Sequence, residues 1–150
     1  MPFGATLALA VTLAFTGGSS QIQAQIPTTT EAFDQSQTVE EYIRDYFADE
    51  PILAEVASCE SHFTQFDKNG NVVKNANSSA VGVFQIMSSV HATFADQKLG
   101  LDIYSLQGNA AYARYLFDHQ GLKPWEASKS CWSKSSAYRD MQAELAVNAN

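Results

Sequence analysis

The sequence predicts a mainly α-helical protein that also contains a short β-hairpin or loop region. Apolar residues recur at helical spacing over residues 39–47, over 51–63 and again over 108–120. A turn-forming segment at 67–71 separates the second stretch from the third and is followed by short apolar runs. With 150 residues, 45% of them hydrophobic and 17% charged, the chain is expected to build one globular domain around its own core.

The first helix is predicted to follow Thr38. This threonine precedes the apolar stripe of residues 39–47 as an N-cap, and Glu41 stands at the capping-box position. A second helix is expected after residue 50, with Asp49 as its cap and Pro51 in its first turn. Apolar residues continue its buried face at Ile52, Leu53, Val56, Ala57 and Phe63.

The segment Asp67–Asn71 is typical of a turn, and Val72 and Val73 after it are expected to form a strand of a small hairpin. A calcium-binding EF-hand loop starting at Asp67 is excluded. Such a loop needs glycine at its sixth position and glutamate at its twelfth, where this chain has Val72 and Ser78.

The later part of the chain, from residue 108, predicts further helices. The stretch 80–87 mixes apolar residues with one glutamine, and the stretch Gly108–Gln120 has a helical period that ends before a glycine at 121, the residue type typical after a helix. Pro124 and Trp125 are expected to open a short helix. Residues 135–150 are expected to form a C-terminal helix or a disordered tail.

The N-terminal segment is interpreted as an export signal. Phe3–Phe15 is almost wholly apolar, and small residues precede Gln25, so residues 1–24 are expected to be a signal peptide. Residues 25–37 are then a linker and 38–134 the folded domain. No Lys or Arg precedes Arg44, which is unusual for a signal, and the alternative is a buried apolar helix.

Export predicts a secreted or cell-envelope protein, in which Cys59 and Cys131 can form a disulfide. Closing so long a loop is expected to contribute roughly 4 kcal/mol to stability. The alternative makes Cys59 a nucleophile with His62 or His91 as its base. The histidines lack the short paired spacing of a zinc site, so no metal is expected.

The net charge of −7 excludes some partners. The chain has no basic run to neutralise phosphates, so nucleic acid is not expected as a partner. No apolar run of about twenty residues occurs after the N-terminal segment, so we expect no stable membrane insertion once the signal is cleaved.

Glu60 is the candidate catalytic residue that the spacing singles out. It lies four residues after Val56 and three after Ala57, which places its side chain on the apolar face of the second helix. Apolar surroundings raise the pKa of a carboxyl group, as a general acid near neutrality requires. The structural alternatives are an ion pair with Arg114 and a side chain that reaches solvent from the edge of the stripe.

Between Glu60 and Gly82 the only other acid is Asp67. Glycosidic cleavage generally uses two carboxyl groups, but an aspartate in such a turn is most often a local backbone acceptor. A lone acid suits a reaction in which a group of the substrate is itself the nucleophile, so that one residue acts first as acid and then as base.

Three motifs in order give the chain a resemblance to a known family. They read CESHF at 59–63, GVFQI at 82–86 and GNAAYARYL at 108–116, and they are followed by PW at 124–125 and CW at 131–132. Over residues 38–134 the chain resembles the lysozyme-like superfamily, specifically the soluble lytic transglycosylase domains of bacterial cell-wall metabolism. Resuscitation-promoting factors share the Cys-Glu-Ser opening and are a neighbouring resemblance.

The resemblance implies a lysozyme-like α+β fold with a catalytic helix. It implies that Glu60 protonates the glycosidic oxygen between N-acetylmuramic acid and N-acetylglucosamine, and then takes the proton of the muramyl 6-hydroxyl as that oxygen attacks the anomeric carbon. The product would be a 1,6-anhydro sugar. The implied partner is the peptidoglycan glycan strand, no cofactor is needed, and a monomer is expected.

The resemblance also implies the substrate contacts. Gln85 corresponds to the glutamine of the family motif and would bind sugar. Val83 and Phe84 replace the Leu-Met of that motif, and the Ala-Tyr-Asn motif with its cleft tyrosine is absent. Tyr112 or Trp132 is expected to substitute for this tyrosine. The full set of expected substrate-binding residues is Ser61, Phe84, Gln85, Asn109, Tyr112 and Trp132. The alternatives are a hydrolytic lysozyme and a non-catalytic cell-wall-binding module.

Overall fold

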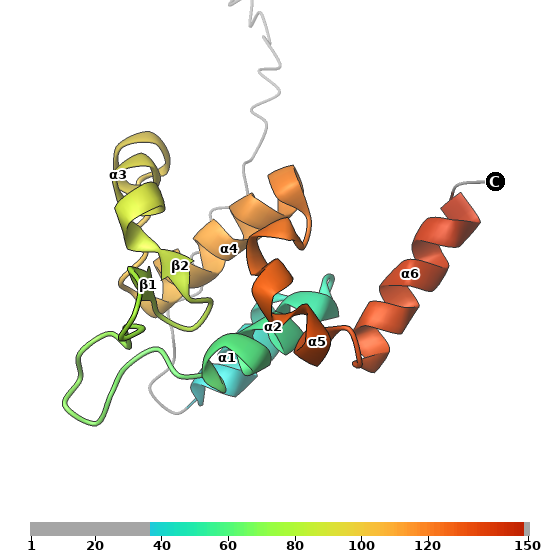
Figure 1. The fold of residues 1–150 in the computed structure, drawn as a ribbon, viewed down its shortest axis with the longest axis horizontal. Helices are drawn as coiled ribbons and strands as arrows, with labels where there is room; N and C mark the ends of the chain where they lie inside the picture. Colours follow the sequence, from blue (N-terminus) through green and yellow to red (C-terminus); the bar gives the residue numbers. More distant parts are fainter. Residues whose placement is uncertain (1–36, 149–150) are drawn as a thin grey trace, which may run out of the picture.

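The computed structural model describes residues 37–148, so the predicted signal peptide and all but the last residue of the predicted linker lie outside the described residues. The described part is mainly helical, as predicted, with one small antiparallel sheet (Figure 1). In chain order the elements are α1 (Val39–Tyr46), α2 (Pro51–Ser61), β1 (Ala80–Val81), β2 (Ile86–Met87), α3 (Ser88–Leu99), α4 (Leu106–Gln120), the 3-10 helix η1 (Lys123–Ser128), α5 (Lys129–Trp132) and α6 (Ser136–Asn148).

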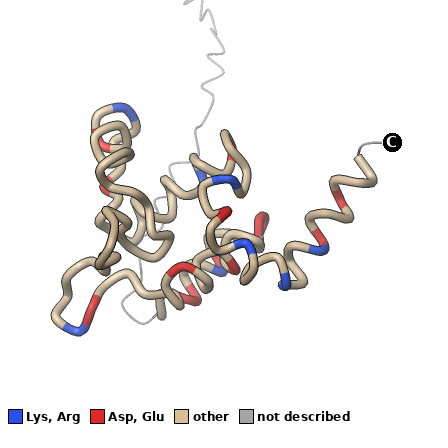
Figure 2. Tube along the Cα trace, in the orientation of Figure 1, with Lys and Arg blue, Asp and Glu red and all other residues tan. Residues whose placement is uncertain are grey.

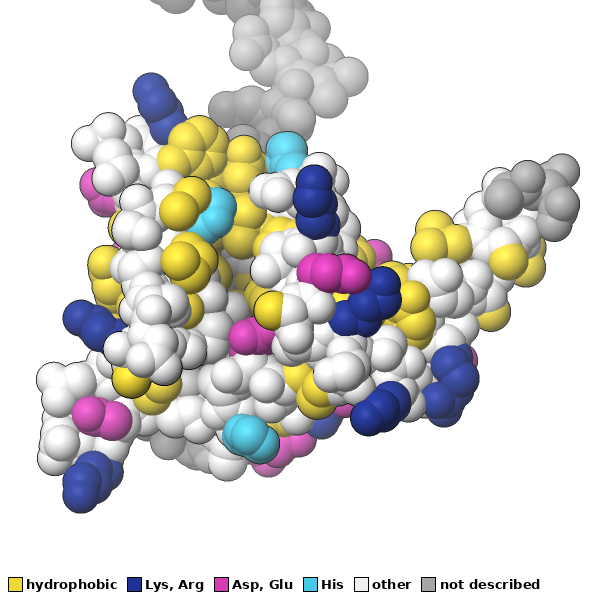
Figure 3. Space-filling view, viewed as in Figure 1, with side chains coloured by type: hydrophobic (Ala, Val, Ile, Leu, Met, Phe, Trp, Pro, Cys, Tyr) yellow, Lys and Arg dark blue, Asp and Glu magenta, His cyan; other side chains and the backbone are white. Residues whose placement is uncertain are grey.

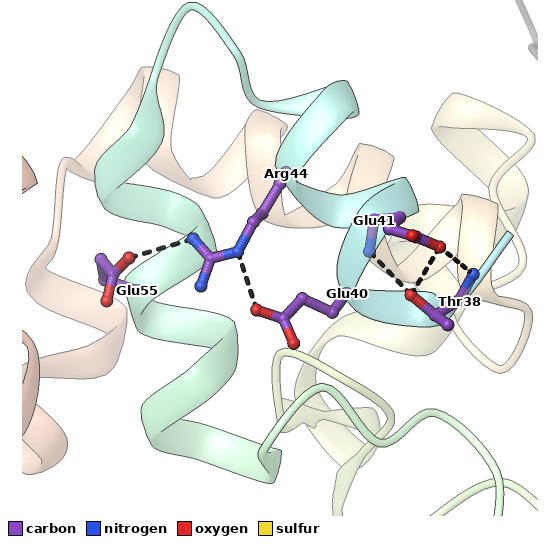
Figure 4. A network of polar contacts seen from close by, with 5 residues as sticks. All are labelled: Thr38, Glu40, Glu41, Arg44 and Glu55. Carbon is purple, nitrogen blue, oxygen red and sulfur yellow. Dashed lines mark hydrogen bonds and ion pairs between the residues drawn. The ribbon is translucent and has the colours of Figure 1, made fainter.

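The start of α1 confirms the predicted capping box. The hydroxyl of Thr38 accepts a hydrogen bond from the backbone N–H of Glu41 at 3.2 Å, and the Glu41 carboxylate accepts one from the backbone N–H of Thr38 at 2.8 Å (Figure 4). Farther along α1, Arg44 forms ion pairs with Glu40 at 2.9 Å and with Glu55 of α2 at 3.2 Å. These contacts link the exposed sides of the first two helices.

Helix α2 begins at Pro51, as predicted, but the predicted capping by Asp49 is wrong. The N-cap is Glu50, and no side chain caps the helix. The Asp49 carboxylate instead forms an ion pair with Arg114 of α4. The pair connects the start of α2 to α4, which also explains why Arg114 does not pair with Glu60.

The small sheet lies later in the chain than predicted. Strands β1 and β2 are antiparallel, with Ala80 opposite Met87 and Val81 opposite Ile86. The predicted turn at Asp67–Asn71 is present, but Val72 makes only an isolated bridge. Val72 pairs with Phe66 across the turn, and Lys74 pairs with Val81, but neither bridge extends into a regular strand.

Helix α3 was not predicted from the sequence. Its large apolar residues Val90 and Phe94 are 65% and 41% exposed, and Ala95 is its only buried residue. Because the apolar residues do not gather on one buried stripe, the helix has no clear amphipathic period. It ends at Gly100, which has a positive φ of 65° and adopts the left-handed conformation that favours glycine.

Helix α4 starts at a serine cap and ends at the predicted Gly121. Its inner side joins α1, α2, the loop before β2, and η1 around the core. The large side chains that are almost completely buried there include Ile43, Phe47, Ile52, Leu53, Val56, Val83, Phe84, Ile103, Tyr112 and Trp132.

The C-terminal segment is helical, and α6 extends away from the rest of the molecule (Figure 1). None of its residues is buried, but Ala137, Tyr138 and Met141 near its start pack against the core. Its later residues Leu145 and Val147 are exposed. A groove of about 580 Å³ lies between α6 and the body of the fold.

The predicted disulfide between Cys59 and Cys131 is present and joins the end of α2 to α5. Both cysteines are thereby used, so the alternative in which Cys59 is a nucleophile is wrong. Acidic and basic residues are dispersed along the described chain without a continuous basic stripe (Figure 2). Within residues 37–148 no helix is long and apolar enough to cross a membrane, and no group of three or more metal-ligating side chains gathers.

Candidate active site around Glu60

Glu60 occupies the last turn of α2 and is half-buried. Its Oε1 accepts a hydrogen bond from the hydroxyl of Ser128 at 2.6 Å. Its Oε2 accepts no hydrogen bond from the described residues, and no described side chain has a buried polar atom without a partner. The free oxygen is therefore open to solvent, so one side of this carboxyl is fixed and the other is accessible.

Two opposing effects set the pKa of Glu60. Burial disfavours the charged carboxylate and raises the pKa, while the hydrogen bond from Ser128 favours the charged form and lowers it. Burial is the larger effect, so the pKa lies above its usual value. Such a carboxyl retains its proton to higher pH than an exposed glutamate, as a general acid requires.

The chain turns sharply just after Glu60. His62 and Phe63 both have positive φ angles, of 53° and 56°, although neither is a glycine. The Ser61 hydroxyl donates to the carbonyl of Val83 at 2.8 Å and accepts from the backbone N–H of Thr64 at 3.0 Å. Ser61 thus fastens the end of α2 to the loop between the two strands, which supports a role in organising the site.

The loop between β1 and β2 is built around Gly82, whose φ is +73°. A Cβ at this position would lie 2.5 Å from Nδ2 of Asn109 and 2.7 Å from Oε1 of Gln65, so only glycine fits. The two neighbouring amides also hold the loop. Oε1 of Gln65 accepts from the N–H of Val83 at 2.8 Å, and Oδ1 of Asn109 accepts from the N–H of Phe84 at 2.9 Å.

Gln65 was not among the residues that the sequence singled out, although it is only 1% exposed. Its Nε2 donates to the carbonyl of Tyr104 at 2.9 Å, so both ends of the amide are used. The residue lies in an irregular segment with no apolar period, and its partners are distant in sequence. The residues around Gln65 in the sequence therefore did not indicate its role in holding the loop.

Gln85 stays a candidate for binding a ligand. Its backbone has a positive φ of 49°, and its side-chain Nε2 donates to the carbonyl of Gly82 at 2.9 Å. The side chain is half-buried, and its carbonyl oxygen accepts no hydrogen bond from the described residues. That oxygen can accept from a sugar hydroxyl or amide.

Two tryptophans connect this loop to the partner of Glu60. The indole N–H of Trp125 donates to the carbonyl of Phe84 at 3.0 Å, and the indole N–H of Trp132 donates to the carbonyl of Trp125 at 2.9 Å. The Ser128 hydroxyl lies 3.1 Å from this same carbonyl of Trp125. A continuous set of hydrogen bonds thus runs from the loop through η1 to Glu60.

Four of the residues predicted to touch substrate are in the core. The side chains of Phe84 and Asn109 are 0% exposed, that of Tyr112 is 1% and that of Trp132 is 2%. Side chains buried to this degree are not placed to pack on a sugar ring, so a direct contact from them is corrected to a supporting role. Asn109 and Trp132 fulfil it through the hydrogen bonds above, Phe84 through packing on Trp125, and Tyr112 through a 3.0 Å hydrogen bond with Nδ1 of His91.

A hollow lies between α3 and the segment formed by the end of α4 and η1, with hydrophobic side chains gathered in it and an acidic side chain at its lower end (Figure 3). Aromatic rings of α3 and α4 are in contact with one another. His91 contacts Tyr112, and Phe94 contacts Tyr115, with ring centroids 5.4 Å and 5.7 Å apart. Burial lowers the pKa of His91, which favours its neutral form. Phe94 is 41% exposed, so its ring offers apolar surface that can pack on a sugar ring, whereas Tyr112 is buried.

Asp67, the only other acid of the 60–82 interval, is committed to its own turn. One carboxylate oxygen accepts from the backbone N–H groups of Asn69 and Asn71 at 2.8 and 2.9 Å. These hydrogen bonds lower the pKa of Asp67, so its carboxylate is charged at neutral pH and is already occupied as an acceptor. Ser128 thus contacts Glu60 directly, and Ser61 ties the end of α2 to the loop that carries Gln85. Among the described residues, no carboxylate is hydrogen-bonded to Glu60.

Comparison with known proteins adds no further argument for the site. The chain matches no family model, no curated protein and no solved structure. The resemblance to lysozyme-like enzymes therefore stays a prediction from the ordered sequence motifs.

Proposed function

We propose that the protein is an exported peptidoglycan lytic transglycosylase with a lysozyme-like fold. It cleaves the β-1,4 bond between N-acetylmuramic acid and N-acetylglucosamine, with Glu60 as general acid and then general base. The observation that carries the proposal is the Glu60 carboxyl itself. It is half-buried, its pKa is raised by burial, one oxygen is fixed by Ser128 and the other is open.

The proposed reaction uses this one carboxyl twice. Protonated Glu60 gives its proton to the glycosidic oxygen, and the bond from that oxygen to the anomeric carbon of the muramyl residue breaks. The resulting carboxylate takes the proton of the muramyl 6-hydroxyl, and the 6-oxygen forms a bond to the anomeric carbon. Glu60 regains its proton and no water is consumed, which yields the 1,6-anhydro product.

The surroundings of Asp67 favour this reaction over hydrolysis. A hydrolytic lysozyme generally needs a second carboxylate to activate water or to act as nucleophile. The Asp67 carboxylate is exposed and is used as an acceptor by its own turn. An internal nucleophile from the substrate removes the need for a second acid.

Export is supported by the apolar segment Phe3–Phe15 and by the disulfide. Disulfides persist in oxidising compartments and are rare in the cytosol. The net charge of −7 gives no electrostatic attraction to an anionic wall, so recognition of the glycan rests on hydrogen bonds and aromatic packing in the hollow.

Mass spectrometry of purified peptidoglycan after incubation with the oxidised full chain tests the proposal. Wild type is expected to release anhydromuropeptides, and Glu60→Gln is expected to release none, while Asp67→Asn retains the activity. Reducing-end products that disappear in both variants would replace the proposal by a hydrolytic lysozyme. Binding of glycan without products from the folded wild type would instead identify a wall-binding module.

A further inference from the structure

We propose that Ser128 is a positioning residue that fixes which oxygen of Glu60 carries the catalytic proton. The inference rests on the proposed function, because it concerns how Glu60 acts as acid and base. The two side chains come from different elements, α2 and η1, and meet across a sequence separation of 68 residues. Ser128 would act through Glu60 without touching the sugar.

The hydroxyl of Ser128 lies between two acceptors. Its oxygen is 2.6 Å from Oε1 of Glu60 and 3.1 Å from the carbonyl oxygen of Trp125. A serine hydroxyl has one proton, so it donates to one of them at a time. A length of 2.6 Å is typical of a hydroxyl that donates to a charged carboxylate, so the proton goes to Oε1 when Glu60 is ionised.

The carbonyl of Trp125 is the alternative acceptor and is itself held in place. The indole N–H of Trp132 donates to it at 2.9 Å, and the Ser128 hydroxyl lies 3.1 Å from it. When Glu60 is neutral, Ser128 still donates to Oε1, which is then the carbonyl oxygen of the carboxyl group, and the carbonyl of Trp125 stays within reach at 3.1 Å. The hydroxyl therefore has a hydrogen-bond partner in both protonation states of Glu60.

This arrangement makes the two oxygens of the carboxyl unequal. Oε1 is occupied by Ser128, whereas Oε2 is open to solvent. The proton that leaves for the glycosidic oxygen is therefore carried on Oε2, and the proton from the muramyl hydroxyl returns to the same oxygen. A symmetric carboxyl would spend part of its time with the proton on the oxygen that faces away from substrate.

Other charged groups do not set the protonation of Glu60. The elements packed against α2 are α1, η1, α5 and α6. Within residues 37–148, burial and the Ser128 hydroxyl are the two causes that shift the pKa of Glu60. The charged residues that these elements carry are Glu40, Glu41, Arg44 and Asp45 on α1, Lys123 and Glu126 on η1, Lys129 on α5, and Arg139, Asp140 and Glu144 on α6.

The first test measures the pKa of Glu60 without any substrate. The full oxidised chain is labelled with ¹³C at glutamate carboxyls and titrated by NMR, and Glu60→Gln assigns the signal. Ser128→Ala is expected to raise the pKa of Glu60 above that of wild type, because a hydrogen bond that favours the carboxylate is lost. Ser128→Thr keeps a hydroxyl and is expected to restore the wild-type value.

Ser135→Ala is the matched control. The Ser135 hydroxyl donates to the carbonyl of Trp132 at 2.8 Å and accepts from the backbone N–H of Tyr138 at 3.1 Å, so this variant removes a hydroxyl nearby without touching Glu60. Its Glu60 titration is expected to match that of wild type. Near-UV circular dichroism verifies the fold of each variant, and Ser128→Ala decides the matter by itself if the threonine variant does not fold.

The second test measures peptidoglycan cleavage. Loss of one hydrogen bond to a charged group is expected to lower kcat of Ser128→Ala by roughly tenfold, while KM is unchanged. An unshifted Glu60 titration together with wild-type kcat in Ser128→Ala would overturn the role of Ser128 and leave the proposed function intact. Absence of cleavage by wild type would instead overturn the proposed function, and the titration would still decide whether Ser128 controls the carboxyl.

Discussion

At the scale of single residues, the proposed role of Glu60 comes with a cost to stability. Burial raises its pKa in the folded state, so folding favours the protonated form. The contribution of Glu60 to stability is therefore most favourable at low pH, below the pKa of the unfolded chain, and it is lost as the pH rises through the folded pKa. A neutral isostere has no such dependence.

Glu60→Gln is consequently expected to gain stability relative to wild type as the pH rises, although it removes the proposed activity. Urea unfolding of both proteins at several pH values between 4 and 8 measures the difference. At the acid end the two curves are expected to coincide, because both side chains are neutral there. A difference that is constant over the whole range would contradict the raised pKa.

Gly82 gives a second residue-scale prediction. Gly82→Ala is expected to cost roughly 2–4 kcal/mol of unfolding free energy, since it combines a positive φ with a collision against the buried amides of Asn109 and Gln65. Gly70→Ala is the matched control, because its φ is +81° but a Cβ there meets nothing within 4 Å. It is expected to cost only about 1–2 kcal/mol, the backbone part alone. Equal losses in chemical denaturation would show that the collision is relieved by movement.

At the scale of elements, the disulfide fixes η1 and α5 against the end of α2. Cys59 is the neighbour of Glu60, and Cys131 follows Ser128 by less than one turn of helix, so the covalent link spans the same two segments as the Glu60–Ser128 hydrogen bond. Double replacement of the two cysteines by serine is expected to lower stability by roughly 4 kcal/mol. Denaturant unfolding of the variant and of the oxidised and reduced wild type measures the loss, and equal midpoints would contradict it.

How far the elements could be predicted depends on where their signal lies. The cap at Thr38, the helix end at Gly121 and the mainly α class follow from neighbouring residues, and the structure confirms them. Helix α3 was not predicted because its large apolar residues are exposed and form no buried stripe. The strand pair was predicted at Val72 and Val73, before its actual position at 80–87, because the turn at Asp67 is a strong local signal. Gln65 and Ser128 form hydrogen bonds with partners 18 and 68 residues away in the sequence. Contacts over such separations leave no pattern among neighbouring residues, so they could not be predicted.

At the scale of the whole molecule, α6 is attached through its first turns only. The ring of Tyr138 packs edge-on against that of Trp132, with the ring centroids 5.3 Å apart, whereas Leu145 is 58% exposed. Tyr138→Ala is expected to cost about 1–2 kcal/mol through lost apolar and aromatic contact, and Leu145→Ala less than about 0.5 kcal/mol. Thermal unfolding of the two variants compares them. An equal loss would mean that the whole helix is packed on the body.

The loop at Val83 and Phe84 has a consequence for how this chain can vary. Four side chains from other segments form hydrogen bonds with its backbone. Gln65 and Asn109 accept from its N–H groups, while Ser61 and Trp125 donate to its carbonyls. The path of the loop is thus specified by residues outside it. Its own two side chains need only fill apolar space, so a Leu-Met pair and a Val-Phe pair can occupy the same backbone. Sequence drift within the loop is then compatible with an unchanged site, whereas replacement of any of the four distant residues is not.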